Sequence, residues 1–368
     1  MEVTTIGIDI AKRIFQLHGV NNNGKTVLKK RLMRDQVLIF MSNLPKCLVG
    51  IEACGGSNYW ARELSKLGHE VKLMAPQFVK PYVKTNKNDE ADAEAICEAV
   101  ARSNMRFVPI KTVEQQDMLS IHRVRARLVK NRTALANEIR GLLLEFGIII
   151  PQGINKIVDK LTEVLDSDQL SGISYQTFSD LKEEYITNDK RVKELENRLK
   201  ILSNQCILYK RLQEIPGGGL ITGTALIASI GNASCFKNGR QLASWLGLVP
   251  RQNSSGGKTK LLGISKRGDV YLRSLLVQGA RAILNAKLRY ISKKDQIHAN
   301  CSKFTEWICN LSERCGSNKT VVAIANKLAR VIFAVLSSGN AYLEQKVCNS
   351  TIIEEIFKEF QPGICVRE

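Results

Sequence analysis

The sequence has few of the residues that build zinc sites or disulfide frameworks. It contains only four histidines, and its ten cysteines are scattered without a C-x-x-C pair. So few histidines argue against a structural zinc site. Scattered cysteines without an export signal are typical of reduced thiols in the cytosol. We therefore expect the cysteines to fill protein cores.

The sequence also has no segment with the pattern of an export signal or a membrane span. It begins MEVTTIGIDIAK, a strand pattern where an export signal would have a basic stretch followed by an apolar run. The most apolar late stretch, Val321 to Leu336, contains Lys327 and Arg330. This stretch predicts an amphipathic helix instead of a membrane span, and we expect no membrane partner.

Acidic residues are too few to balance the basic ones. The chain has 35 acidic residues against 54 basic ones, a net charge of +19. Such an excess attracts polyanions, and nucleic acid is the commonest of them in cells. A ribosome-associated or merely basic protein is the alternative. At 368 residues, the chain is long enough for two or three domains that each bury a core.

Residues 1–112 predict an α/β domain. Apolar, β-branched runs predict strands near 3–10, 14–20, 26–31, 47–51 and 70–74, with helices near 34–43 and 59–67. The cluster Asn21 to Gly24 predicts a tight turn between two strands. Strands that alternate with helices after an opening meander are typical of an α/β sheet.

Residues 113–208 predict long helices. Apolar residues recur every seven positions from Ile121 to Leu142, and three and four apart from Val192 to Cys206. This spacing is typical of a coiled-coil seam, so we expect a long helical hairpin or a dimerisation arm. An ordinary layer of a helical bundle fits the pattern equally well. Residues 209–345 predict a mainly helical C-terminal domain, and residues 346–368 predict a tail.

Four acids in the first quarter of the chain are candidate metal ligands, and stability alone gives no reason for the two in the strand patterns. Asp9 lies in the first strand pattern, Glu52 follows an apolar strand pattern, and Asp89 and Asp92 lie three apart at the start of a helix. A buried carboxylate costs several kcal/mol unless it is compensated, and a spacing of three places both helix acids on one face. Brought together, the acids would form an oxygen cage suited to Mg²⁺ or Mn²⁺.

Each of these acids also has a structural interpretation. Asp89 could be a helix N-cap, and Asp92 could be a favourable charge in the first helical turn. The two strand acids could pair with buried basic residues. Spacing alone does not separate the two helix acids from Glu90 and Glu94 as metal ligands.

A loop rich in glycine and serine at 253–258 is the second chemically suggestive segment. A serine between flexible glycines and cations could attack a phosphodiester, because positive charge stabilises both the alkoxide and the phosphorane. Alternatively, Ser254 and Ser255 only donate hydrogen bonds to a phosphate. The residue pattern by itself favours this second interpretation, in which the serines bind a phosphate without attacking it.

The serine loop lies in the most basic segment of the chain. From Lys237 to Asp295, thirteen basic residues stand against two acidic ones. Such a density favours a surface that binds a nucleic-acid backbone over a merely solvated face. The turn from Ile215 to Gly219 resembles a hairpin whose backbone N–H groups meet phosphates. The residues expected to contact nucleic acid are Arg251, Ser254, Gly256, Lys258, Lys260, Lys266, Arg267 and Arg273.

In combination, these stretches resemble the Asp-Glu-Asp-Asp transposases of insertion sequences, the IS110 family, whose relatives include the Piv-type DNA invertases. The matching stretches are IGIDIAK, GIEACGGS, KNDEADA, IPGGG, LGLVPRQNSSGGK and LGISKRGDVYLRSLL. They extend over nearly the whole chain, and the last two are most similar to the IS1111 branch. Gly218 departs from the pattern, because the hairpin of the family usually has an apolar residue there, and it predicts a less rigid turn.

The resemblance implies a RuvC-like (RNase H-type) domain, a coiled-coil insertion and a C-terminal transposase domain. It implies RNA-guided recombination between an insertion element and its target, both double-stranded DNA, with a noncoding bridge or seek RNA encoded by the element. Homodimers and homotetramers are the implied assemblies, and the bacterial cytoplasm, at the nucleoid, is the expected location.

The resemblance also assigns roles to residues. By motif position, Ser255 is the nucleophile that links covalently to DNA, and Ser254 is one residue away. The metal ligands and further catalytic residues, for Mg²⁺ or Mn²⁺, are Asp9, Glu52, Asp89 and Asp92.

Three other function classes fit parts of the sequence. A metal-dependent nuclease of the Holliday-junction-resolving type would use the same four acids with water as the nucleophile. The stretch Gly7 to Asp9 also suits the first phosphate strand of an actin-like or sugar-kinase-like ATPase, but no second Asp-containing phosphate loop or adenosine motif follows. A non-catalytic nucleic-acid-binding protein would need only the basic charge.

Overall fold

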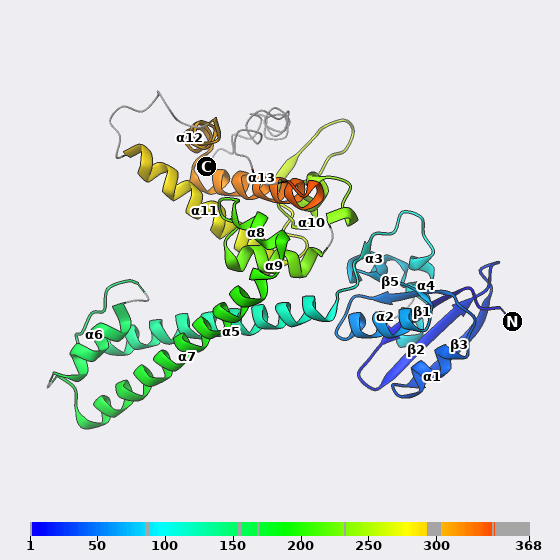
Figure 1. Cartoon of the computed structure of the whole chain (residues 1–368), viewed down its shortest axis with the longest axis horizontal. Coiled ribbons are helices and arrows are strands. Elements are labelled where there is room, and N and C mark those ends of the chain that lie inside the picture. The colour runs from blue at the N-terminus through cyan, green and yellow to red at the C-terminus, as the bar shows by residue number, and fades with distance from the viewer. Residues whose placement is uncertain are drawn as a thin grey trace. The chain divides into compact units, whose positions relative to one another are not determined.

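The computed structural model describes residues 2–84, 88–153, 156–167, 169–231, 233–292, 303–340 and 342. Its contacts divide the chain into two compact units, residues 1–113 and 114–368 (Figure 1). The helical region predicted at 113–208 and the domain predicted at 209–345 thus share the second unit, and the boundary between them stays a prediction. The predicted tail at 346–368 lies outside the described residues.

A six-stranded sheet with the order β3-β2-β1-β4-β5-β6 forms the centre of the first unit. The strands β1 (Thr5–Ile10), β2 (Ile14–Val20) and β3 (Thr26–Met33) form an antiparallel meander. The strands β4 (Leu48–Glu52) and β5 (Glu70–Met74) continue from β1 in parallel, and β6 (Phe107–Val108) pairs antiparallel with β5. This mixed α/β arrangement is consistent with an RNase H-like fold.

Helices cover both faces of this sheet. The helices α1 (Gln36–Ser42) and α2 (Ser57–Lys66) pack on the face that carries Ile6, Ile8 and the main apolar core of the unit. The helix α4 (Asp89–Val100) packs on the opposite face, together with α3 (Pro76–Val79) and a 3₁₀ turn, η1 (Lys80–Tyr82). Because side chains alternate along a strand, Gly7 and Asp9 share the α4 face.

The helix α4 lies close to the sheet because two glycines lie beneath it. Gly7 of β1 and Gly50 of β4 are partners in the parallel register. A Cβ atom on Gly7 would lie 2.3 Å from the carbonyl oxygen of Ala93 and from the backbone nitrogen of Cys97. A Cβ atom on Gly50 would lie 2.8 Å from Cβ of Val100. The two missing side chains therefore set the height of α4 above the sheet.

Two long helices form an arm in the second unit (Figure 1). The helices α5 (Val113–Leu144) and α7 (Gly172–Asn204) are antiparallel, since the ion pairs Arg125–Glu196 and Arg132–Asp189 join them. A third helix, α6 (Lys156–Leu165), shares one apolar cluster with both. In the seven-residue repeat, Leu128 and Leu135 are buried but Leu142 is exposed. A supercoiled coiled-coil geometry thus stays a prediction.

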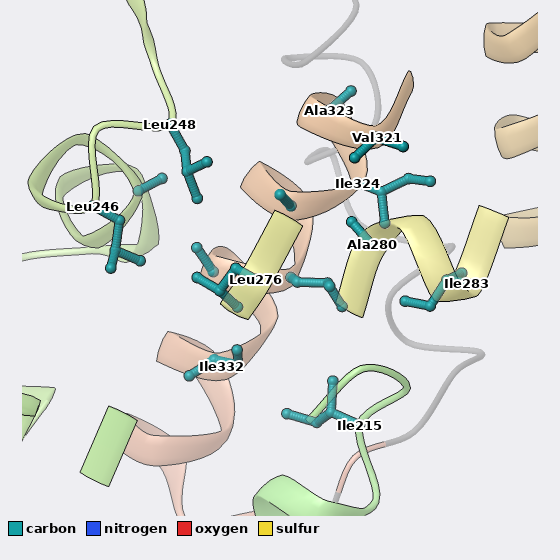
Figure 2. Close-up of a cluster of buried hydrophobic side chains, with 14 of the residues drawn as sticks. Ile215, Leu246, Leu248, Leu276, Ala280, Ile283, Val321, Ala323, Ile324 and Ile332 are labelled. Atoms are coloured by element: carbon teal, nitrogen blue, oxygen red, sulfur yellow. The ribbon is translucent and has the colours of Figure 1, made fainter. Parts of the chain in front are cut away.

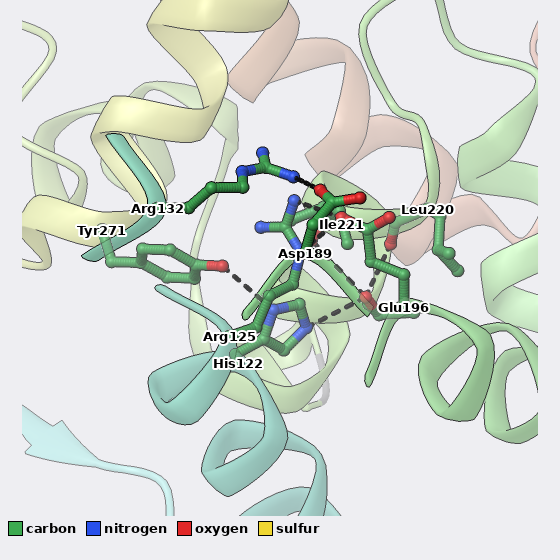
Figure 3. A network of polar contacts seen from close by, with 9 residues as sticks. His122, Arg125, Arg132, Asp189, Glu196, Leu220, Ile221 and Tyr271 are labelled. Carbon is green, nitrogen blue, oxygen red and sulfur yellow. Dashed lines mark hydrogen bonds and ion pairs between the residues drawn. The ribbon is translucent and has the colours of Figure 1, made fainter. Parts of the chain in front are cut away.

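A buried polar network ties α5 to two other helices, α9 (Leu220–Ile230) and α11 (Val270–Ser292) (Figure 3). The ring of His122 lies 3.1 Å from the Tyr271 hydroxyl at Nδ1 and 3.0 Å from the Thr224 hydroxyl at Nε2. The Thr224 hydroxyl donates to the carbonyl oxygen of Leu220 at 2.6 Å. Its oxygen therefore accepts from Nε2–H, and Nδ1 accepts from Tyr271. A neutral imidazole thus connects three helices.

The helix α13 (Ser317–Ser338) is central to the largest apolar cluster of the second unit. It packs against α10 (Gly239–Trp245), α11 and α12 (Lys303–Cys315). Figure 2 shows residues of α11 and α13 interleaved with Leu246 and Leu248 from the segment after α10. The segment that leads to the serine loop is therefore anchored in this core.

The helix α13 is buried over most of its length, and its two charged residues do not face solvent as those of the predicted amphipathic helix would. It is long and apolar enough to cross a membrane, but 67% of its most apolar window is buried inside the protein. Even Lys327 and Arg330 are buried. The ammonium group of Lys327 lies 5.0 Å from the ring centre of Phe304 and 4.8 Å from that of Trp307. Aromatic faces accommodate a cation in an apolar setting.

Replacement of Gly7 by alanine should loosen α4 from the sheet. The added Cβ would meet backbone atoms, which cannot rotate away, so we expect a loss of about 1–3 kcal/mol in the stability of the first unit. Hydrogen exchange of the α4 amides should be correspondingly faster in Gly7→Ala. Gly55→Ala is the matched control, because a Cβ there meets nothing within 4 Å. Equal exchange rates in both variants would contradict the close packing.

The pH dependence of stability should report the buried His122. Burial, and then the charge of Arg125, lower the pKa of His122 from 6.5 to about 4. The unfolded chain takes up this proton near pH 6.5 and the folded chain does not, so stability is lost as the pH falls from 6.5 towards 4. We expect the second unit to lose about 2 kcal/mol at pH 5 relative to pH 7 through this residue. Denaturant titrations at both pH values should show a smaller loss in His122→Gln, and an equal loss would exclude this role.

Candidate active site

The two strand acids follow the two glycines on the α4 face of the sheet. Asp9 lies two residues after Gly7 in β1, and Glu52 lies two residues after Gly50 at the end of β4. The parallel register pairs the two glycines, so the two acids lie level on adjacent strands.

Three of the predicted acids act on the fourth, Asp9. Burial, and then the charges of Asp92, Asp89 and Glu52, raise the pKa of Asp9 from 3.8 to about 6. Only a hydrogen bond with the backbone of Ile10 opposes this shift. Carboxylates from β1, β4 and the first turn of α4 therefore gather on one side of the sheet. No cation is among the groups that shift the pKa of Asp9, so the idea that it pairs with a buried basic residue finds no support.

The donor chemistry of this carboxylate cluster fits a hard divalent cation. Oxygen ligands with a surplus of negative charge suit Mg²⁺ or Mn²⁺, and a cation would remove the repulsion that raises the pKa of Asp9. As the side chains stand, no three His, Cys, Asp or Glu residues in the described part of the chain are close enough to hold a metal ion.

The start of α4 overturns one of the structural interpretations of these acids. The side chain of Asn88 caps the helix by accepting a hydrogen bond from the backbone N–H three residues on, at 2.7 Å. Asp89 is the first helical residue, so the N-cap interpretation of Asp89 was wrong. Glu90 forms an ion pair with a lysine of β3 at 2.9 Å. Neither Glu90 nor Glu94 is among the groups that raise the pKa of Asp9.

Cys54 is a residue near the cluster that sequence reasoning missed. It is exposed, and partial burial of its sulfur raises its pKa, followed by the charges of Glu52 and Asp9. The expectation that cysteines fill cores is correct for Cys47 and Cys97, which are buried, and wrong for Cys54 and Cys235, which are exposed. The available signal for Cys54 was its place two residues after Glu52. Cys47, Cys54 and Cys97 are free thiols.

The serine loop is the tip of a β-hairpin that the sequence did not predict. The strands β7 (Pro250–Gln252) and β8 (Leu261–Ile264) pair antiparallel. At the tip, the backbone N–H of Lys258 donates to the carbonyl oxygen of Ser255 at 3.0 Å. Gly256 and Gly257 have φ angles of 55° and 76°. Two consecutive positive φ angles are what a type I′ turn requires, which explains the glycine pair.

The two serines of the hairpin have different surroundings. The Ser254 hydroxyl oxygen accepts hydrogen bonds from the Gln252 side chain at 2.9 Å and from the backbone N–H of Lys260 at 3.3 Å. The Ser255 hydroxyl is exposed and has no hydrogen-bond partner among the described residues. Four further residues expected to bind nucleic acid are exposed on the same hairpin: Arg251, Gly256, Lys258 and Lys260.

Arg273 differs from the other residues expected to bind nucleic acid, because it is buried. Its guanidinium donates to the carbonyl oxygens of Leu246 at 3.0 Å and Arg267 at 2.8 Å. It therefore joins the segment before the hairpin to the turn after it. Lys266 and Arg267 are exposed on that turn, and Lys266 has a φ angle of 54°.

Two glycines allow that turn to pack against the segment before the hairpin. A Cβ atom on Gly247 would lie 2.2 Å from the carbonyl oxygen of Arg267, and one on Gly268 would lie 1.9 Å from that of Trp245. Asn326 of α13 adds a hydrogen bond to the carbonyl oxygen of Leu248 at 3.1 Å. Backbone contacts and buried polar side chains thus fix the base of the hairpin.

The turn at Ile215 to Gly219 lies between α8 (Ile207–Gln213) and α9. A Cβ atom on Gly218 would lie 2.2 Å from the carbonyl oxygen of Leu212. Gly217 packs against Gly279 of α11, where a Cβ atom would lie 2.9 Å from the Gly217 carbonyl oxygen. The turn is closely packed around its glycines, and its rigidity stays a prediction.

Two family models match the two segments that hold these candidate sites. A model named DEDD_Tnp_IS110 and described as Transposase matches residues 6–148, which include all four acids. A model described as Transposase IS116/IS110/IS902 family matches residues 209–296, which include the serine hairpin. The chain belongs to the IS110 family of transposases. The resemblance read from the motifs is thereby confirmed.

Relatives of this transposase match over nearly its whole length. A protein named "Probable family 20 transposase" from Pseudomonas aeruginosa is 46% identical, over 93% of this chain and 99% of its own. The "Transposase for insertion sequence element IS1111A" from Coxiella burnetii is 43% identical, over 93% and 92%. The "Pilin gene-inverting protein" of Moraxella bovis is 24% identical, over 93% and 98%. A transposase cuts and rejoins DNA, so this chain is a DNA-acting enzyme.

Replacement of Asp9 by asparagine should stabilise the metal-free first unit at neutral pH. The folded-state pKa of Asp9 is raised to about 6, so its contribution to stability is present below pH 3.8 and lost as the pH rises through 6. We expect Asp9→Asn to gain about 1–3 kcal/mol at pH 7 in EDTA and nothing below pH 4. Thermal unfolding curves at both pH values measure the difference.

Addition of Mg²⁺ should make the wild-type protein more stable than Asp9→Asn at neutral pH. The wild-type first unit should be stabilised by the ion, and Asp9→Asn should respond much less because it lacks one ligand charge. Glu90→Gln is the matched control, since Glu90 belongs to the same helix but pairs with Lys29, and it should respond like the wild type. An undiminished Mg²⁺ response in Asp9→Asn would rule out Asp9 as a ligand.

Proposed function

We propose that this transposase cuts and rejoins the DNA of an insertion element and its target through Ser255. In the proposed reaction, Mg²⁺ held by Asp9, Glu52, Asp89 and Asp92 assists the serine at the scissile phosphate. Mn²⁺ could take the place of Mg²⁺. The reaction would occur in the bacterial cytoplasm, on DNA of the nucleoid.

The proposal rests on the exposure and the hydrogen bonding of the Ser255 hydroxyl. It is exposed at the tip of the hairpin, and none of the described residues forms a hydrogen bond with it. The neighbouring Ser254 already accepts two hydrogen bonds within the hairpin. An exposed hydroxyl can reach a phosphodiester, and the nearby cations Arg251, Lys258 and Lys260 would stabilise the charge on the phosphate as it reacts.

The proposed chemistry consists of two transesterifications. In the first, Oγ of Ser255 attacks the phosphorus, a bond between Oγ and phosphorus forms, and the bond to the leaving sugar oxygen breaks. The serine proton passes to solvent, and the leaving oxygen takes up a proton. In the second, a sugar hydroxyl of the partner DNA attacks the phosphoserine and releases the serine. Each step exchanges one phosphoester bond for another, so no nucleotide cofactor is required.

The carboxylate cluster would supply the metal ion. A bound divalent ion neutralises charge on the phosphate and polarises it toward attack. The residues of this chain that contribute are the two strand acids and the two acids of the first turn of α4. Their mutual repulsion, expressed in the raised pKa of Asp9, supports a cluster of this kind.

The guide RNA and the assembly enter the proposal from the family resemblance. An element-encoded structured RNA would select the donor and target DNA, and homodimers or homotetramers would hold the strands. The excess of basic residues, 54 against 35 acidic ones, gives the chain the charge to bind both kinds of nucleic acid. Base pairing with the RNA would then carry the sequence specificity.

Replacement of Ser255 by alanine should abolish the covalent protein–DNA adduct. Loss of the attacking hydroxyl removes the first transesterification, while the basic surface that binds nucleic acid is unchanged. The adduct can be measured by denaturing gel electrophoresis after incubation with supercoiled DNA, the RNA and Mg²⁺. Ser254→Ala is the matched control, and its adduct yield should fall by no more than about tenfold, because it loses only hairpin hydrogen bonds.

The same assay separates the proposal from a nuclease that uses water. If Ser255→Ala still cleaves DNA and Asp9→Asn does not, the carboxylate cluster alone performs the reaction. If Ser254→Ala abolishes the adduct and Ser255→Ala does not, the nucleophile is the neighbouring serine. Either result would overturn the assignment of Ser255.

A further inference from the structure

Between residues 120 and 137, the outward face of α5 carries charge of one sign only. This face is turned away from α7 and the two ion pairs that join the helices. In this range three of the exposed residues of α5 are cations, six are neutral and none is acidic, and the next exposed residue is the acidic Glu138. The exposed positions between residues 120 and 137 are Ser120, Arg123, Val124, Arg127, Lys130, Asn131, Thr133, Ala134 and Asn137.

The inward arginines of α5 are neutralised, whereas its outward cations are not. Arg125 donates to the carboxylate of Glu196 at 2.6 and 2.8 Å, and Arg132 pairs with Asp189 (Figure 3). The outward cations form no ion pair with any residue in the described ranges. Their charge therefore does not help to hold the arm together, and it stays available to an external partner.

The outward face of α7 can be compared with that of α5, because both belong to the same arm. It is equally exposed, but it interleaves acids with cations: Asp180, Glu183, Glu184 and Glu194 with Lys190, Arg191 and Arg198. A helix face that only meets solvent gains from such a mixture, because opposite charges three or four residues apart stabilise a helix and like charges destabilise it. The spacing of Arg123 and Arg127 has the opposite effect, so solvation alone does not explain this face of α5.

We propose that Arg123, Arg127 and Lys130, the α5 stripe, bind the sugar-phosphate backbone of duplex DNA. At a rise of about 1.5 Å per residue, the stripe is roughly 10 Å long and matches about three phosphates of one strand at ~3.4 Å each. The exposed amide of Asn131 adds a neutral donor of the kind that positions a backbone.

Duplex DNA is the occupant that fits, because the chain belongs to a family of transposases, which act on DNA. The stripe is far along the sequence from the serine hairpin and contains no group that could take part in phosphoryl transfer. It would therefore add affinity without base specificity. The inference goes beyond the proposed chemistry and does not depend on Ser255.

The test is the salt dependence of DNA binding by the full-length protein. Glutamine keeps the helix propensity of arginine and lysine but removes the charge, so the variant is Arg123→Gln/Arg127→Gln/Lys130→Gln. In fluorescence anisotropy with a labelled DNA duplex, its slope of log K against log salt should be less steep by about 2–3. Its affinity near 0.1 M salt should be lower by roughly tenfold or more.

The control variant removes the same charge from the outward face of α7. Lys190→Gln/Arg191→Gln/Arg198→Gln should change the slope by less than about one, because these cations lie among acids. Equal slope changes in the two triple variants would overturn the proposal, since the effect would then come from net charge alone. An unchanged slope in the stripe variant, or a change seen only with labelled RNA, would also overturn it.

A single substitution guards against a folding defect in the triple variant. Arg127→Gln, at the centre of the stripe, should lower the slope by about 0.9, the value for one phosphate contact. The binding assay can be run in a Ser255→Ala background, where no adduct forms. A failed adduct assay would then leave the binding result intact, and a failed binding result would leave the assignment of Ser255 intact.

Discussion

The close approach of α4 to the sheet is the constraint on which the first unit depends. Gly7 and Gly50 offer no side chain beneath the helix, so its backbone rests directly on β1 and β4. Any side chain there would lift the helix and carry the first turn of α4, with its two acids, away from the strand acids. That approach contributes to the raised pKa of Asp9, because the pKa is raised first by burial and then by like charges within range. Packing and chemistry are therefore set by the same two positions.

Much of the first unit could be predicted from the sequence, because local patterns decide it. Five strands lie where β-branched runs placed them, and the turn at Asn21 to Gly24 forms with Gly24 at a φ angle of 73°. The strand β6 could not be predicted, since two residues have no measurable period. The same holds for the cap of α4, where Asn88 and Asp89 are both good N-caps and only the backbone geometry chooses between them.

The second unit was less predictable, because tertiary contacts decide it. The type I′ hairpin depends on two short strands whose pairing is fixed by Arg273 and Asn326, residues that follow in later helices. Composition marked Arg273 as one more cation near a serine loop, and only burial distinguishes it from its neighbours. Arginine has three separate uses in this unit: it pairs with acids along the arm, it holds backbone carbonyls beneath the hairpin, and it stays exposed on outward surfaces. No residue pattern separates those uses, since each depends on what lies across from the side chain.

The arrangement of glycine and acid in β1 and β4 has a consequence for how this chain can vary. In each strand the acid follows the glycine by two residues, and side chains on a strand alternate between the faces. Whether the number of residues from the glycine to the acid is even or odd therefore decides on which face of the sheet the acid lies. Removal of one residue between glycine and acid would turn the acid into the apolar layer beneath α1 and α2, whereas a gain of two would return it to the α4 face one repeat farther along. The residue in between, Ile8 or Ile51, can change its identity within the limits of the core, but it cannot be lost.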